Sequence, residues 1–320
     1  MPFMRTAVPG APGAHLPSQP LQCSVEQLQL PAMVSPVCFL CRSPSSVVCG
    51  ECGAHSCSPA HGAIHRHAVA GCLPVKIEHR QGVGNCCVAT RDISPGETIL
   101  LDTPAVWGPN LKSAPKCLNC LGAWRGALCP DCQFPVCDEQ CAQGAHHVQE
   151  CGVLARIGQK YTFTPGEQSN PALSMVNVIR FLRLPVTHPE KAARANLLMD
   201  HLEDIVKNED LYNMWKVSAI EPLVHKLPNS PYTEEDVLHA IGVLQTNTVA
   251  IGVPGHNQGH ALYPTFSYLS HSCVCNARFQ ILPDHTLVLR AQVPIPAGEE
   301  ITIQYMTPML GNVTRRRKIR

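Results

Sequence analysis

The sequence predicts a fold of the α+β class, with strand-forming segments on both sides of a helical middle region. Apolar and polar residues alternate in residues 286–293 and again in residues 301–305, which is typical of strands with one buried face. Between residues 170 and 249 the apolar residues instead recur at helical spacing. Segregated strands and helices of this kind favour the α+β class.

Turn residues separate the predicted strands. Pro and Gly in residues 294–298 indicate a turn between the two C-terminal strands, because Pro fixes φ and Gly tolerates positive φ. The run Ser-Pro-Gly at residues 94–96 indicates a second turn, so residues 80–100 are predicted to form strand, turn and strand. Gly82 and Gly84 alone indicate only a turn or a bulge.

Three helices are predicted in the middle region. Residues 172–182 and residues 192–206 each have an apolar face. Thr233 is a predicted N-cap of the third helix, with acidic residues in the first turn that suit the helix dipole. The face expected to be buried on the second helix comprises Leu197, Leu198, Leu202 and Ile205. Three histidines are interpreted as helix-surface or packing residues, namely His201, His225 and His239.

The composition limits the classes of function. The 320 residues carry a net charge of +1, which gives no bulk attraction for nucleic acid or an anionic membrane. Aromatic residues are sparse at 5%, whereas there are 18 cysteines, so metal sites are expected to supply part of the stability. We find no secretory signal and no apolar run near the roughly 18–20 residues of a membrane span. We therefore predict an intracellular protein. In a reducing compartment, clustered cysteines are expected to bind metal and not to form disulfides.

Residues 36–73 contain four closely spaced pairs of soft ligands, enough for two tetrahedral Zn²⁺ sites. The pairs are Cys38 and Cys41, Cys49 and Cys52, Cys57 and His61, and His67 and Cys72. His65 is an alternative to His67, and His55 is interpreted as a surface residue. The repeated Cys-x2-Cys spacing makes a chance grouping the weaker interpretation. Residues 1–35, rich in Pro, Ala, Gly and Gln, are expected to be a disordered leader.

Residues 113–152 contain a second cluster of four pairs. They are Cys117 and Cys120, Cys129 and Cys132, Cys137 and Cys141, and His147 and Cys151. His146 is an alternative to His147, but the spacing to Cys151 favours His147. We interpret the first cluster as a degenerate copy of the second, so that the chain contains an internal repeat of two fingers.

Several motifs resemble the SET domain family. Residues 267–277, Ser-Tyr-Leu-Ser-His-Ser-Cys-Val-Cys-Asn-Ala, resemble its Asn-His-Ser-Cys-x-Pro-Asn loop, with Ser270 at the Asn position and Cys275 at the Pro position. Residues 298–305, Gly-Glu-Glu-Ile-Thr-Ile-Gln-Tyr, resemble the strand that follows in that family. The second cluster has the spacing of a MYND zinc finger. The chain thus resembles SET-and-MYND proteins, most closely the arthropod SmydA group, which usually carries Arg where Asn85 stands.

The resemblance implies a split SET β-fold with an inserted MYND finger and a helical insert. The implied parts are an N-terminal MYND-like zinc finger at 36–73, a first SET segment at 74–112, the MYND finger at 113–152, the helical insert at 153–243 and the core SET segment at 244–320. A cysteine-rich post-SET segment, which usually follows in the family, is not found after Tyr305.

The resemblance also implies how the zinc ligands are shared. In MYND fingers the pairs interleave, so Cys117, Cys120, Cys137 and Cys141 are expected to hold one zinc, and Cys129, Cys132, His147 and Cys151 the other. The same interleaving groups Cys38, Cys41, Cys57 and His61, and then Cys49, Cys52, His67 and Cys72. Cys273 corresponds to the first ligand of a further zinc, to which Cys275 could add a second.

The implied function is protein-lysine N-methylation, with S-adenosylmethionine as the methyl donor and histone or non-histone lysine as the acceptor. Tyr305 corresponds to the catalytic hydroxyl. The implied cofactor-binding residues are Gly82, Gly84, Asn85, Asn247, Ser270 and His271. Ser270 offers a hydroxyl in place of an amide, and one lost hydrogen bond costs on the order of 1 kcal/mol.

A non-enzymatic alternative is a SET scaffold that acts as a zinc-finger protein-interaction adaptor in transcriptional repression. Ser270, Asn85 and the missing post-SET segment favour the adaptor, whereas Tyr305 and the Gly-Glu-Glu sequence favour the enzyme. Direct nucleic-acid binding is disfavoured because neither finger has a basic recognition helix. We expect a monomer of the nucleus and cytoplasm, without membrane attachment, whose partners are a protein substrate and peptides bound by the MYND finger.

Overall fold

The computed structural model describes residues 47–48, 55–56, 58, 74–82, 84–109, 114–253 and 256–305. The expected leader lies outside these residues, and so do the eight expected ligands of the N-terminal finger: Cys38, Cys41, Cys49, Cys52, Cys57, His61, His67 and Cys72. Of that finger the structure describes β1 (Val47–Val48) and β2 (His55–Ser56), which pair antiparallel.

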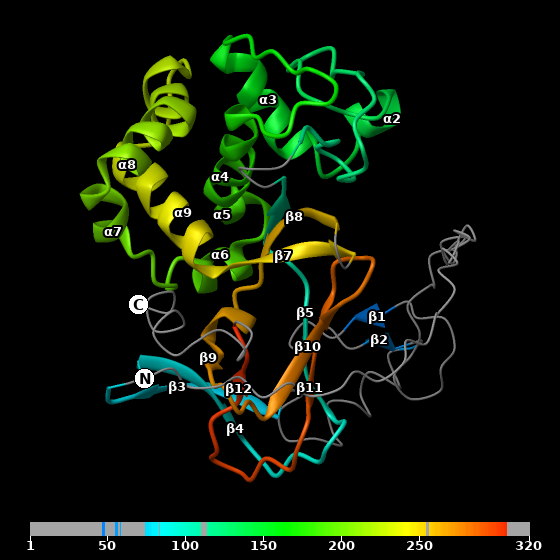
Figure 1. The fold of residues 1–320 in the computed structure, drawn as a ribbon, viewed down its shortest axis with the longest axis vertical. Helices are drawn as coiled ribbons and strands as arrows, with labels where there is room; N and C mark the ends of the chain where they lie inside the picture. The colour runs from blue at the N-terminus through cyan, green and yellow to red at the C-terminus, as the bar shows by residue number, and fades with distance from the viewer. Residues whose placement is uncertain are drawn as a thin grey trace, which may run out of the picture. The chain divides into compact units, whose positions relative to one another are not determined.

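Strands from both ends of the described chain combine in one sheet (Figure 1). The strand β5 (Thr98–Asp102) pairs with β11 (Leu287–Ala291), and β11 pairs with β10 (Ala277–Ile281), all antiparallel. Next to this sheet in sequence, β3 (Val75–Arg80) and β4 (Gly84–Ala89) form a hairpin. The strand segments before and after the helices therefore build a common fold.

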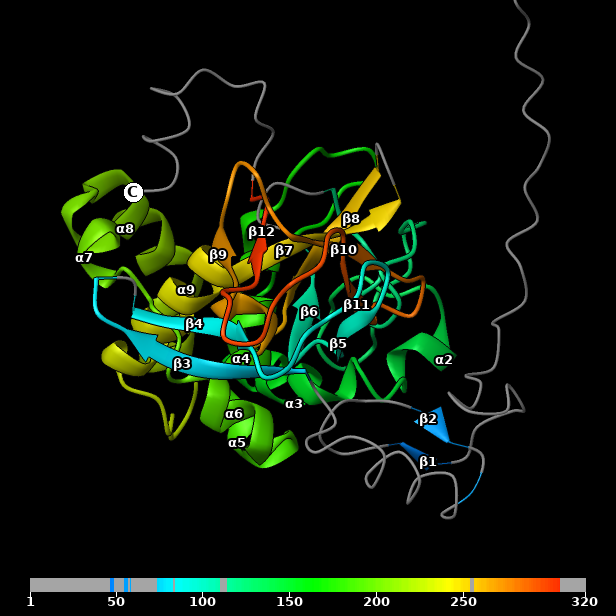
Figure 2. The same cartoon turned by 90° about the horizontal axis from the view of Figure 1, so that it is seen from below.

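A second sheet joins the two halves of the chain in the same way. Its order is β6 (Val106–Gly108), β8 (His256–Leu262), β7 (Thr248–Val253), with antiparallel pairing throughout. Two further short strands, β9 (Ser270–His271) and β12 (Thr302–Ile303), pair in parallel (Figure 2). This last pair brings the two C-terminal motifs of the sequence side by side.

The two predicted turns lie next to each other. Gly96 and Gly298 each have φ +81, a backbone conformation that glycine adopts without strain. Close to them, the backbone amides of Ile93 and Ile295 donate to each other's carbonyl oxygens at 2.9 and 3.0 Å. These reciprocal bonds fix the first strand segment against the second.

The helices occupy the middle of the sequence, as predicted. Two of them, α2 (Glu139–Ala142) and α3 (Val148–Ile157), belong to the second Cys/His cluster. The central helix, α4 (Ser174–Leu182), is buried along most of its length. The others are η1 (Pro171–Leu173), α5 (Leu184–Thr187), α6 (Pro189–Ala195), α7 (Leu202–Lys207), α8 (Glu209–Trp215), the π-helical η2 (Lys216–Lys226), α9 (Glu234–Asn247) and η3 (Phe266–Tyr268).

The predicted N-cap of the third helix is confirmed. The hydroxyl of Thr233 accepts from the backbone N–H of Asp236 at 3.1 Å, and the Asp236 carboxylate accepts from the backbone N–H of Thr233 at 2.8 Å. This reciprocal capping box satisfies two amides that the first turn leaves unpaired. It explains why α9 begins at Glu234.

The single helix predicted over residues 192–206 is wrong. Helix α6 ends at Ala195 and α7 begins at Leu202, and Leu197 in between is 72% exposed. The connecting segment is held against α9 instead: the Asn247 amide donates to the Met199 carbonyl at 2.9 Å, and a Cβ at Gly242 would lie 2.4 Å from the Asp200 carbonyl oxygen. These tertiary contacts override the helical pattern. Among the helices of the described chain, none is long and apolar enough to cross a membrane.

Candidate functional site

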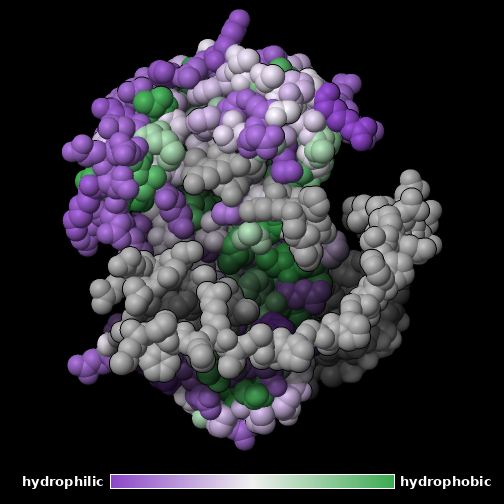
Figure 3. Space-filling model, viewed as in Figure 1, coloured by the Kyte–Doolittle hydropathy of each residue, from purple (hydrophilic) through white to green (hydrophobic). Residues whose placement is uncertain are grey.

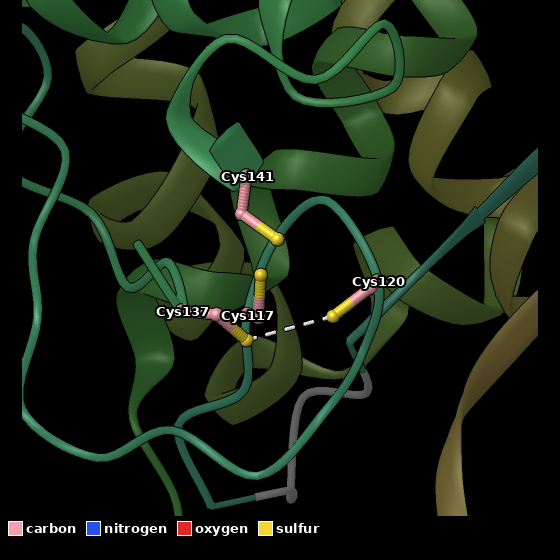
Figure 4. Close-up of side chains that lie close together, drawn as sticks. All are labelled: Cys117, Cys120, Cys137 and Cys141. Atoms are coloured by element: carbon pink, nitrogen blue, oxygen red, sulfur yellow. Dashed lines mark hydrogen bonds between the residues drawn. The ribbon is translucent and has the colours of Figure 1, made fainter. Parts of the chain in front are cut away.

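The first metal-binding group is formed by four cysteines whose sulfur atoms converge in Figure 4: Cys117, Cys120, Cys137 and Cys141. All four sulfurs lie within 4.8 Å of one another, and the Cys120 and Cys137 sulfurs are 3.6 Å apart. Four thiolates held tetrahedrally at about 2.3 Å from zinc are separated by about 3.8 Å. The donor set and its spacing therefore fit a structural Zn²⁺.

The second group, Cys129, Cys132, His147 and Cys151, is buried. The Cys129 and Cys151 sulfurs are 3.7 Å apart, and the Cys132 sulfur is 3.6 Å from Nε2 of His147. A tetrahedral zinc with ligands at about 2.3 and 2.0 Å requires nearly the same separations. These residues fit a Cys₃His zinc site in which Nε2 is the ligand atom. The structure thus groups the eight side chains as the resemblance implies.

Local turns bring the ligands together. After each Cys-x2-Cys pair the chain folds back: Leu121 N–H donates to the Cys117 carbonyl at 2.8 Å, and Gln133 N–H donates to the Cys129 carbonyl at 2.9 Å. The alternative ligand His146 is turned away from both groups, since its ring stacks on Trp107 with centroids 3.7 Å apart. The structure therefore places His147 in the second group, as the spacing to Cys151 favoured.

The other candidate site is a cavity of about 810 Å³. Its wall comes from segments that are far apart in the sequence. They are the start of β4, the residues from the end of α6 to α8, the junction of α9 and β7, η3, Phe279 of β10, and residues 303–305 at β12. The lining residues that matter below are Gly84, Asn85, Asp200, Asp204, Asn247 and Tyr305.

The structure brings together some of the predicted cofactor residues and not others. Gly84, Asn85 and Asn247 line the cavity, together with the predicted catalytic Tyr305. The remaining three are not on its wall: Gly82, Ser270 and His271. Ser270 and His271 form β9 instead, where they pair with Thr302 and Ile303 of β12. They therefore contact the cavity wall through this strand pairing, since Ile303 is one of the lining residues.

Gly84 and Asn247 shape the cavity in different ways. Gly84 has φ +88, and a Cβ placed there would meet no atom within 4 Å, so the backbone presents an open face. The Asn247 side chain donates to the carbonyls of Met199 and Val243, each at 2.9 Å. Asn247 thus fixes the segment after α6 against the end of α9, and with it one side of the cavity.

Tyr305 lines the cavity. The residue is 53% exposed, and its part-buried hydroxyl donates to the Leu269 carbonyl. Burial of the hydroxyl, followed by the nearby Cys87 and Glu300, raises the pKa of Tyr305 above its ordinary value. The phenol therefore stays protonated near neutral pH and keeps one oxygen lone pair for a ligand.

Cys273 has no complete ligand set among the residues that the structure describes. Its sulfur lies 3.5 Å from Nε2 of His271, while the Cys275 sulfur lies 3.6 Å from the Gln292 side-chain oxygen. Within the described part of the chain, groups of three or more metal ligands occur only at the two sites formed by residues 117–151. The expected further zinc at Cys273 stays a prediction.

Sequence reasoning missed the wall contributed by the segment after α6. Asp200 and Asp204 line the cavity there, alongside the exposed Leu197 and Met199. The neighbouring face of α7 and α8 is mostly hydrophilic with separate apolar patches (Figure 3). No periodic signal could reveal this wall, because the helical pattern pointed to a continuous helix through it.

A family model described as the SET domain matches residues 84–306. The match covers more than half of the chain, and the protein belongs to the SET domain family.

The curated relatives support a SMYD-like, SmydA-related assignment within this family. SET domain-containing protein SmydA-8, isoform A, of Drosophila melanogaster is 29% identical over 249 residues, which is 72% of this chain and 50% of the fly protein. Histone-lysine N-methyltransferase ASHR1 of Arabidopsis thaliana is 25% identical over 74% of this chain and 50% of its own. Histone-lysine N-methyltransferase SMYD3 of Mus musculus is 42% identical over 62 residues, 19% of this chain and 14% of its own. The chain thus spans about half the length of the first two.

Proposed function

We propose that this protein is a protein-lysine N-methyltransferase that transfers a methyl group from S-adenosylmethionine to a lysine of a histone or non-histone protein. The observation that carries the proposal is the cavity lined jointly by Gly84, Asn85, Asn247 and Tyr305. Membership of the SET family and the names of ASHR1 and SMYD3 as histone-lysine N-methyltransferases support it.

The charge of the cavity suits cationic ligands. Its described lining contains two carboxylates, Asp200 and Asp204, and no Lys or Arg. Asp200 also accepts a hydrogen bond from His239 at 2.9 Å. Burial raises the pKa of Asp200, but the hydrogen bonds from His239 and from the Leu202 amide outweigh it, so the pKa lies below its ordinary value. Both the sulfonium of the methyl donor and a lysine side chain carry positive charge, so this field favours their entry.

The chain's own residues would orient the lysine rather than deprotonate it. When bound, the cofactor supplies an electrophilic methyl group. The free lysine pKa is near 10.4, and a dry, narrow channel favours the neutral amine. The Tyr305 oxygen, with its proton donated to Leu269, can accept a hydrogen bond from that amine and align it for attack. No dedicated general base is needed.

The test is a methyl-transfer assay with radiolabelled S-adenosylmethionine and the zinc-loaded full chain. Core histones and an array of lysine peptides serve as acceptors. We expect label on lysine of an acceptor, and no label when that acceptor lysine is replaced by arginine. The amount of label should fall strongly when the protein carries Tyr305→Phe. Absence of label on every acceptor, with the protein folded and zinc-loaded, would contradict the proposal.

A second candidate function is a zinc-finger adaptor in transcriptional repression. Ser270 favours it, because this residue replaces the family's Asn and is not among the residues that line the cavity. The adaptor predicts peptide binding by the finger without heat on titration of S-adenosylmethionine. A peptide affinity that is unchanged in Tyr305→Phe, together with a silent cofactor titration, would select this function over the enzyme.

We also propose that residues 113–152 are a MYND finger holding two zinc ions, that the N-terminal finger holds two more, and that the protein acts as a monomer in the nucleus and cytoplasm. The paired ligand groups support the zinc assignment. Elemental analysis of the full chain is expected to give about four zinc per molecule. A folded protein without metal would contradict it.

A further inference from the structure

Two charged side chains are buried beside the second zinc group. Glu150 is 0% exposed and Arg180 is 1% exposed. Glu150 lies on α3 between the ligands His147 and Cys151, whereas Arg180 lies on α4, outside the finger. Burying an ion pair is costly unless its hydrogen bonds are satisfied, so the purpose of this pair requires an explanation.

Glu150 contacts the histidine ligand directly. Its Oε1 lies 3.1 Å from Nδ1 of His147, while Nε2 of the same ring faces the Cys132 sulfur. A carboxylate that accepts from the far nitrogen of a zinc-bound histidine fixes the tautomer and the ring orientation, and makes the ligand nitrogen more basic.

Arg180 holds Glu150 in place and connects it to the rest of the fold. Its Nε donates to Oε2 of Glu150 at 2.9 Å and its Nη2 donates to Oε1 at 2.6 Å. Nη2 also donates to the Leu118 carbonyl at 2.7 Å, and Nη1 contacts the Trp107 carbonyl at 2.5 Å and Nε2 of His146 at 2.6 Å. These five contacts use all five N–H donors of the guanidinium.

The partners of Arg180 come from three elements. Trp107 belongs to β6, Leu118 lies in the first turn of the finger, and Glu150 belongs to α3. The planar fork of arginine suits such simultaneous contacts, whereas lysine would provide a single ammonium group. The guanidinium therefore ties the finger to α4 and to the sheet of β6, β7 and β8.

We propose that Glu150 and Arg180 are positioning residues for the second zinc site. Glu150 orients His147 for the metal, and Arg180 fixes Glu150 against α4 and β6, so the geometry of this zinc site depends on the helical insert. The first site differs because its four ligands are cysteines, so it has no histidine ring for a carboxylate to orient. Arg180 reaches this site only through the backbone, at the Leu118 carbonyl between Cys117 and Cys120. The Asn119 side chain lies between the two sites: its amide N–H donates to the Cys141 sulfur at 3.8 Å, and its oxygen accepts from the His147 backbone N–H at 3.3 Å.

The test is site-resolved zinc retention in Glu150→Gln. The zinc-loaded full chain is incubated with a chelator, pulsed with an alkylating reagent and mapped by mass spectrometry. We expect the cysteines of the second group to be modified 10- to 100-fold faster than in the wild type, and those of the first group at the wild-type rate. The second-group cysteines are Cys129, Cys132 and Cys151; those of the first group are Cys117, Cys120, Cys137 and Cys141.

The matched control is Glu139→Gln. Glu139 is an exposed carboxylate of the same finger whose described side-chain contact is with Gln143, so zinc retention should not change. Equal rates for Glu150→Gln and Glu139→Gln would overturn the proposal. Rapid modification of both groups in the wild type would instead overturn the zinc assignment on which the proposal rests. Neither outcome depends on methyl transfer.

A double variant separates positioning from stability. Replacing a buried ion pair by apolar residues of similar size often preserves or raises stability, so Glu150→Met with Arg180→Met is expected to stay folded. His147 has then lost its carboxylate, and the second site should still release zinc 10- to 100-fold faster. Normal zinc retention in the folded double variant would show that the pair only fills space, and would contradict the positioning role.

Discussion

The backbone N–H of Tyr305 donates a 3.0 Å hydrogen bond to Nδ1 of His271. The bond joins the predicted catalytic residue to the loop motif that precedes it by 34 residues. Since Nδ1 accepts, the ring proton lies on Nε2, which faces the Cys273 sulfur at 3.5 Å. His271 thus orients the tyrosine through the backbone although it does not line the cavity.

Replacing His271 by alanine is expected to lower the unfolding free energy by about 1 kcal/mol, the typical net value of one hydrogen bond, and to reduce methyl transfer because Tyr305 loses its anchor. Thermal unfolding and the transfer assay measure the two effects. Cys273→Ser is the control, because it leaves the bond to Nδ1 intact. If His271→Ala and Cys273→Ser lose equal amounts of stability and of methyl transfer, the hydrogen bond from Tyr305 to His271 is not the cause of the loss.

Tyr305→Phe is expected to reduce the rate of methyl transfer by roughly 100-fold, because the lysine amine loses the hydrogen bond that aligns it for attack. The affinity for S-adenosylmethionine should change less than about threefold, since we propose that the lost hydroxyl contacts the lysine and not the cofactor. Single-turnover kinetics and calorimetry measure the two quantities. An unchanged rate would assign Tyr305 a packing role.

Gly82 and Gly84 form a matched pair of glycines. Their φ values are +79 and +88, and neither would bring a Cβ within 4 Å of another atom. Alanine at either position should therefore cost about 1 kcal/mol of stability through backbone strain. Of the two glycines only Gly84 lines the cavity. Only Gly84→Ala should therefore also weaken the binding of S-adenosylmethionine. If Gly82→Ala and Gly84→Ala bind S-adenosylmethionine with equal affinity, Gly84 does not contribute to the cofactor site.

Asp102 predicts a pH dependence of stability. Burial raises the pKa of Asp102 to about 6, although amide bonds from Phe266 and Thr265 and the nearby Lys191 and Arg194 oppose the shift. The folded state therefore binds the proton more tightly than the unfolded chain, and its stability falls as pH rises from about 4 to 6. Between pH 5 and 7.5 the loss is about 1 kcal/mol.

Asp102→Asn should remove this loss, because the amide cannot ionise. The stability gained by the variant over the wild type should therefore be larger at pH 7.5 than at pH 5. Denaturant unfolding at both pH values measures it. A gain that is the same at both values would contradict the raised pKa of Asp102.

Local signals in the sequence predicted the parts of the fold that local physics controls. The capping box at Thr233, the turns at Gly96 and Gly298 and the separation of strands from helices all follow from the properties of single residues and their neighbours. The grouping of the zinc ligands followed from their paired spacing together with the family resemblance. The strand partners, such as β5 with β11, could not be derived from local alternation, because pairing depends on contacts between distant segments.

The sequence failed where tertiary contacts override local preference. Residues 196–201 leave the helix because Asn247 and the close approach at Gly242 hold them, and this places Asp200 on the cavity wall. One sequence feature could have indicated a buried ion pair. Arg180 is the single cation in the apolar stretch of residues 175–182, and burying it without a partner is costly. Its position therefore indicated a carboxylate partner elsewhere in the chain, which is Glu150.

We propose that the cavity lined by Tyr305 binds S-adenosylmethionine. Isothermal titration calorimetry of the zinc-loaded full chain tests it most directly, with Asn247→Ala measured in parallel, since this change releases the wall that Asn247 holds against Met199. We expect saturable heat with one cofactor per chain, and an affinity that is at least about fivefold lower in the variant, which corresponds to the loss of one hydrogen bond. No heat at millimolar cofactor, or equal affinity in both proteins, would contradict it.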